Sequence, residues 1–68
     1  MTLRTGYVKW FDKDHGFGLI SPLDGSSDVY VDRHAIATTT KLLLEGQHVE
    51  FSTQQSSRGP SAADVIAF

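Results

Sequence analysis

Turn-forming residues divide this sequence at short, regular intervals, and that feature limits the fold more than any other. They fall at residues 14–16, 22–26, 45–46 and 56–60. The segments between them are short and rich in valine and other strand formers, which predicts strands rather than helices. We expect strands near residues 4–12, 17–21, 28–33, 47–54 and 60–67.

Alternation of apolar and polar residues assigns an inner and an outer face to these strands. In residues 28–32, Val29 and Val31 share one face and Tyr30 lies on the other. Val49 and Phe51 alternate inward in the same way. The first segment is less regular, because strict alternation would expose too many large rings, and we expect a bulge or a strong bend there.

The only helical candidate spans residues 35–44, and its three consecutive threonines weaken it. We expect a short turn of 3₁₀ helix followed by a long loop. Five short strands with one long connection predict a closed or nearly closed all-β barrel. The chain has 68 residues and no cysteine, so we expect one domain, residues 1–68, that depends on its core alone.

The charge balance limits the kinds of partner. Six Lys and Arg against eight Asp and Glu give a formal net charge of −2, which argues against binding nucleic acid mainly by neutralising phosphates. No apolar run is long enough for a signal peptide or a membrane span, so we expect a soluble, cytoplasmic protein.

Aromatic and basic side chains are concentrated in the first three predicted strands. The rings are Trp10, Phe11, Phe17 and Tyr30, and the nearby cations include Lys9 and Lys13. A flat surface of rings edged by cations suits single-stranded nucleic acid, since every base has a face to stack. The alternative, that Phe11 and Phe17 are simply core residues, stays open.

The order of several motifs resembles the bacterial cold-shock domain. They are Gly6-x-Val8-Lys9-Trp10-Phe11-Asp12, His15-Gly16-Phe17-Gly18-Leu19-Ile20, Asp28-Val29-Tyr30-Val31, Glu45-Gly46-Gln47-x-Val49-x-Phe51 and Arg58-Gly59-Pro60. The resemblance runs from about residue 6 to residue 65. It implies a five-stranded antiparallel Greek-key barrel of the OB type, in a family of stress-response RNA chaperones that bind single-stranded RNA or DNA.

Carried onto this chain, the resemblance gives a set of nucleic-acid-binding residues. They are Lys9, Trp10, Phe11, Lys13, His15, Phe17, Tyr30, Arg33 and Arg58. Five motif positions depart from the family pattern. His15 replaces a lysine, Tyr30 replaces a phenylalanine but keeps a ring, Leu19 and Arg33 replace rings, and Asp32 replaces a histidine. Because stacking is worth roughly 1–3 kcal/mol per base, we expect reduced affinity.

The sequence offers two alternatives to nucleic-acid binding. Asp32 and His34, with Asp28 and His15 nearby, form the only grouping that suggests catalysis or metal binding, and no third ligand has recognisable spacing. We therefore expect that the protein is not an enzyme and that it binds neither a cofactor nor a metal.

The stronger alternative is a protein-interaction or oligomerisation module. The run Leu42-Leu43-Leu44 lies in a predicted loop, and three consecutive leucines cannot all face one small core. The alternative, that two of these leucines cap the open end of the barrel, stays open. We expect either a monomer or a dimer formed by exchange of the last two strands between protomers.

Overall fold

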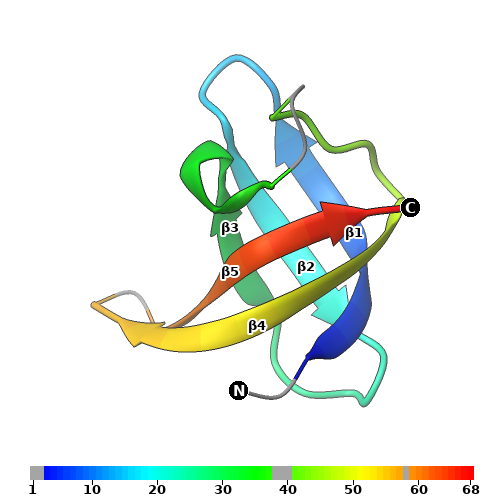
Figure 1. Ribbon diagram of the computed structural model, residues 1–68, viewed down its shortest axis with the longest axis vertical. Coiled ribbons are helices and arrows are strands. Elements are labelled where there is room, and N and C mark those ends of the chain that lie inside the picture. Colours follow the sequence, from blue (N-terminus) through cyan, green and yellow to red (C-terminus); the bar gives the residue numbers. More distant parts are fainter. Residues whose placement is uncertain (1–2, 38–40, 58) are drawn as a thin grey trace.

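The chain folds as a closed β-barrel. The computed structural model describes residues 3–37, 41–57 and 59–68. Its elements are β1 (Arg4–Asp12), β2 (Phe17–Pro22), β3 (Val29–Asp32), the short 3₁₀ helix η1 (Arg33–Ala35), β4 (His48–Ser56) and β5 (Gly59–Ala67). The strands close in the order β1-β2-β3-β5-β4, and the long strands β4 and β5 cross in front of the other three (Figure 1). The all-β class and the barrel are confirmed.

The barrel closes through one parallel pairing. β1 pairs antiparallel with β2 and β4, β2 with β3, and β4 with β5. β3 and β5 run parallel, with Tyr30 opposite Ser61. A closed ring with an odd number of strands cannot alternate direction all the way round, so one neighbouring pair must be parallel. The expected antiparallel pattern therefore holds for every strand pair except β3 and β5.

Element boundaries lie close to those expected from the turns. β3 is shorter than predicted, because Asp32 caps η1: its carboxylate oxygen accepts the backbone N–H of His34 at 2.8 Å. The 3₁₀ turn, predicted within 35–44, thus begins earlier, at Arg33. β4 and β5 extend further toward each other than predicted, to Ser56 and from Gly59, and the Ser56 hydroxyl donates to the Gly59 carbonyl at 2.8 Å.

The predicted irregularity in the first strand is present as a register shift between Val8 and Trp10. Beyond it, Phe11 lies opposite Gly18 of β2. A Cβ atom on Gly18 would overlap the Trp10 carbonyl oxygen and lie 2.9 Å from the Phe11 Cα. Glycine at this position therefore allows β1 and β2 to approach closely beside the bulge.

Among the described residues, the buried apolar side chains are aliphatic except for Phe51. The buried apolar residues are Val8, Ile20, Val29, Val31, Ile36, Leu43, Val49, Phe51, Ala62 and Val65. The predicted inward faces are thus confirmed: Val29 and Val31 of β3 and Val49 and Phe51 of β4 are all buried. Leu43 is buried while Leu42 and Leu44 are 47% and 72% exposed, so the leucine run is split between core and surface.

Among the described residues, no helix is long and apolar enough to cross a membrane.

Candidate nucleic-acid interface

The outer face of β1, β2 and β3 carries two rows of side chains. In the first row Trp10 is opposite Leu19, and Leu19 is opposite Tyr30. In the second row Phe17 is opposite Asp12 on one side and Asp32 on the other. The pleat places these side chains outside because their neighbours Ile20, Val29 and Val31 point into the core.

Three rings of these rows form a cluster, which we call the ring cluster: Trp10, Phe17 and Tyr30. Phe17 lies at its centre, with its ring centroid 5.6 Å from that of Trp10 in an edge-on arrangement and 6.2 Å from that of Tyr30 in a stacked one. Trp10 is 36% exposed, and Phe17 and Tyr30 are half-buried. Each ring thus keeps part of its surface open on one face of the barrel, where a planar base can stack on it.

Phe11 lies apart from the ring cluster. It is partly buried and packs against the core, opposite Gly18. Beyond the bulge, Trp10 faces outward and Phe11 therefore faces inward. The two residues, grouped together from the sequence, are separated by the pleat, and Phe11 fits the core interpretation that the sequence left open.

The cations around the ring cluster are less available than the sequence suggests. Lys9 forms an ion pair with Asp28, with 2.9 Å between Nζ and Oδ2. The Arg33 guanidinium donates to the His15 carbonyl at 3.4 Å and lies over Gly16. Lys13 is exposed in the β1–β2 turn, whereas Arg58, also expected to bind, lies outside the described residues.

His15 is held by a carboxylate rather than free at the surface. Its Nδ1 lies 2.8 Å from Asp12 Oδ2, and the backbone N–H groups of Asp14 and His15 donate to Asp12 Oδ1. The side-chain hydrogen bond from His15, followed by the backbone one, holds the pKa of Asp12 below its usual 3.8. The His15 ring still lies 6.1 Å from Phe17, at the edge of the ring cluster.

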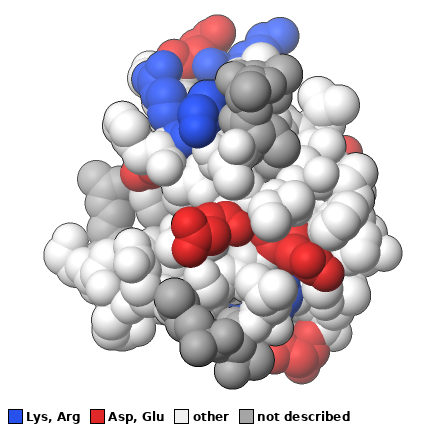
Figure 2. Space-filling view, in the orientation of Figure 1, with Lys and Arg blue, Asp and Glu red and all other residues white. Residues whose placement is uncertain are grey.

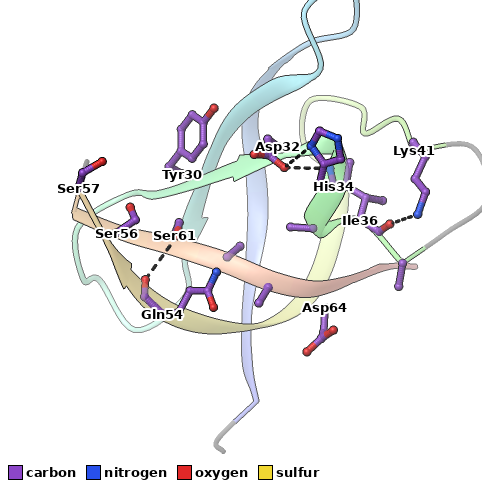
Figure 3. Close-up of a pocket in the computed structure, with 14 residues that line it drawn as sticks. Tyr30, Asp32, His34, Ile36, Lys41, Gln54, Ser56, Ser57, Ser61 and Asp64 are labelled. Atoms are coloured by element: carbon purple, nitrogen blue, oxygen red, sulfur yellow. Dashed lines mark hydrogen bonds and ion pairs between the residues drawn. The ribbon is translucent and has the colours of Figure 1, made fainter.

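A groove adjoins the ring cluster, with a volume of about 640 Å³. Its walls include Tyr30 and Asp32 of β3, His34 of η1, Gln54 and Ser56 of β4, and Ser61 of β5. Figure 3 shows Asp32 between Tyr30 and His34 on one wall, with Gln54 and Ser61 across from them. The groove therefore continues the outer face past the end of the ring cluster.

Sequence reasoning missed the Asp12–His15 and Lys9–Asp28 pairs and this groove. The aspartate at the start of a turn was a usable signal for the first, since such side chains often accept backbone N–H groups two and three residues on. The other two features join segments far apart in the chain.

Figure 2 shows blue Lys and Arg atoms gathered at the end of the molecule where the β1–β2 loop lies, while red carboxylates occupy the middle of the view.

Asp32 and His34, which the sequence suggested for catalysis or metal binding, lie at the solvent-exposed wall of the groove. His34 Nδ1 lies 3.6 Å from Asp32 Oδ1, and His34 is almost fully exposed. Within the part of the chain that the structure describes, no three His, Asp or Glu side chains come together as a metal site.

Comparison with known proteins identifies the family. The 'Cold-shock' DNA-binding domain matches residues 4–68. The cold shock-like protein CspB of Yersinia pestis is 58% identical over 64 residues, covering 93% of this chain and 91% of its own. The cold shock-like protein CspE of Escherichia coli K12 is 56% identical over 68 residues, covering 98% and 99%. The chain belongs to the cold-shock domain family, which is known for binding nucleic acids.

A solved structure of more distant sequence has the same fold. The drosophila Unr CSD456 structure superimposes with a TM-score of 0.81 at 13% identity. The match covers 98% of this chain and 27% of that longer one. The two proteins thus share the barrel fold although few of their aligned residues are identical.

Proposed function

We propose that this protein binds single-stranded RNA or DNA by stacking bases on Trp10, Phe17 and Tyr30, and that it acts as an RNA chaperone in the cytoplasm. The observation that carries the proposal is the ring cluster, whose members keep part of their surface exposed on one face of a small barrel. A domain this short of core material would ordinarily bury such rings. Binding, rather than catalysis, is the activity that this face supports.

The same face accounts for the reduced affinity that we propose. Leu19 lies between Trp10 and Tyr30 in the first row, where a ring would extend the stacking surface. Asp12 and Asp32 lie on either side of Phe17 in the second row and repel phosphates. Lys13 is exposed and remains to contact the strand, and Arg33 can do so by exchanging its hydrogen bond to the His15 carbonyl for one to a phosphate.

Fluorescence of the single tryptophan, Trp10, tests this function directly. Titration with oligo-dT or oligo-U should quench the emission, since a stacked base would cover the indole. The variant Phe17→Ala should weaken binding by about five- to hundredfold, because one stacked base is worth roughly 1–3 kcal/mol.

The matched control is Tyr7→Ala, which removes an exposed ring that contacts His48 and lies outside the ring cluster. It should bind as the wild type does. Equal losses in the two variants, or no quenching of a folded wild type, would contradict the proposal.

Self-association is the second candidate function, and the exposure of Leu42 and Leu44 on either side of buried Leu43 favours it. The occupant of that surface would be a second copy of this chain, and exchange of β4 and β5 between protomers is one route to such a dimer. Light scattering over a range of concentrations tests it. A mass that rises with concentration in the wild type but not in Leu44→Ser would support this function, and a constant monomer mass would exclude it.

A further inference from the structure

We infer that Asp32 makes this face select for guanine among the bases of a bound single strand. The inference rests on the proposed function, and it concerns a carboxylate at one precise place beside the ring cluster. Asp32 is directly opposite Phe17 across the β2–β3 pairing. It also follows Tyr30 by two residues on the same outward face of β3. Side chains that are paired across strands have Cβ atoms about 4.5–5.5 Å apart.

This carboxylate has an oxygen to spare. Asp32 Oδ1 accepts the backbone N–H of His34 at 2.8 Å, and His34 Nδ1 lies 3.6 Å from the same oxygen. Nothing in the described ranges 3–37, 41–57 and 59–68 donates to Oδ2. The side chain is 42% exposed at the wall of the groove, beside Tyr30 (Figure 3).

The other carboxylates near the ring cluster are already in use. Asp12 accepts hydrogen bonds at both of its oxygens, from the backbone of the β1–β2 turn and from the His15 ring. Asp28 forms an ion pair with Lys9, with 2.9 Å between Nζ and Oδ2, so a cation already offsets its charge. Of these three carboxylates, Asp32 is the one that has both a spare oxygen and no Lys or Arg partner in the described part of the chain.

The chemistry of an ionised carboxylate determines which base it can pair with. It only accepts hydrogen bonds, and it repels a phosphate, so the strand must present a base edge rather than its backbone here. Guanine offers two adjacent donors, N1–H and the N2 amino group, which match the two carboxylate oxygens: Oδ2 is unengaged, and Oδ1 can accept a second hydrogen bond beside that of the His34 N–H. Cytosine and adenine each offer one amino group. In thymine and uracil the single N3–H lies between two carbonyl oxygens, which the carboxylate repels.

The expected preference is measurable. A good bidentate pair between a side chain and a base discriminates by about five- to hundredfold. Because Asp32 is partly exposed, we expect the lower part of that range, about five- to tenfold. The base that benefits would be stacked on Phe17 or Tyr30, with its edge toward the groove.

The test uses a thymine heptamer and the set of heptamers with one guanine at each position in turn, titrated by Trp10 fluorescence at about pH 8, where imidazole is ordinarily neutral. The wild type should bind the best guanine strand about five- to tenfold more tightly than the all-thymine strand. Inosine at the same position lacks the N2 amino group but has a similar ring, so it should lose most of the gain. Adenine at that position should also fall short of guanine.

The variant Asp32→Asn keeps an oxygen to accept the His34 N–H and removes the charge. It should abolish the guanine preference and improve binding of the all-thymine strand. The matched control, Asp14→Asn, makes the same change of net charge in the β1–β2 turn and should leave the preference intact. A preference that survives in Asp32→Asn, or equal binding of thymine and guanine strands by the wild type, would overturn this inference while leaving the proposed function in place. Failure of every strand to bind would overturn both.

Discussion

Replacing Gly18 with alanine should be among the most damaging single-methyl additions to this barrel. Gly18 is buried, and an added Cβ would overlap the Trp10 carbonyl oxygen and lie 2.9 Å from the Phe11 Cα. Both atoms belong to the backbone of β1, which cannot move aside as a flexible side chain can. Overpacking ordinarily costs about 1–3 kcal/mol, and we expect the upper end of that range here.

That loss is large for a domain of this size, since a single small core rarely supplies more than roughly 3–5 kcal/mol. At roughly 4–8 °C per kcal/mol, a loss near 3 kcal/mol lowers the melting temperature by roughly 12–24 °C. Urea unfolding followed by Trp10 fluorescence and far-ultraviolet circular dichroism gives the free energy of unfolding, and thermal scans give the melting temperature.

Gly25→Ala is the matched control for the steric argument. Gly25 has φ +82° and nothing within 4 Å of an added Cβ, so this variant loses only the backbone freedom of glycine. A left-handed residue costs about 1–2 kcal/mol. The expected order of stability is wild type, then Gly25→Ala, then Gly18→Ala. A Gly18→Ala protein as stable as the control would refute the reasoning that close approach of β1 and β2 requires glycine.

Three further predictions concern charge and stacking. The slope of log K against log salt for oligo-dT should be shallower than about −4, because each neutralised phosphate of a single strand contributes roughly −0.7 and few cations surround the ring cluster; a steeper slope would mean that charge dominates. The lowered pKa of Asp12 stabilises the fold above its usual 3.8, and this contribution is lost as the pH falls through the lowered value, so thermal scans from neutral to strongly acid solution should show a smaller acid loss in Asp12→Asn. Leu19→Phe should tighten oligo-dT binding about fivefold or more, since the new ring would lie between Trp10 and Tyr30, and the gain should disappear in the double variant with Trp10→Ala.

Much of the fold follows from local sequence signals. Alternation at Val29, Tyr30 and Val31 gave the correct inner and outer faces, because a strand with one buried face fixes its register strongly. The crowding of rings in the first strand indicated the bulge that is found between Val8 and Trp10. The parallel pairing of β3 and β5 was not predicted, although the parity of a closed five-stranded ring requires a parallel pair.

The site was less predictable, because its details depend on contacts between distant segments. Trp10, Phe17 and Tyr30 were grouped correctly from their positions on neighbouring strands. Phe11 was placed with them because alternation cannot say which residue a bulge displaces, and the structure packs it against the core. The pairing of Lys9 with Asp28 depends on where the β2–β3 loop returns, which no local pattern specifies.

The ion pairs around the ring cluster determine what kind of recognition this face supports. An exposed pair such as Lys9–Asp28 is worth only about 0–1 kcal/mol, so a phosphate could displace the aspartate at little direct cost. The displaced carboxylate would then lie unpaired near an anionic strand, which cancels much of the gain. Because Asp12 and Asp32 add to this repulsion on either side of Phe17, added phosphate contacts yield little net attraction. We therefore expect the identity of the few bases that reach the ring cluster, rather than the charge of the strand, to decide which nucleic acids this protein binds.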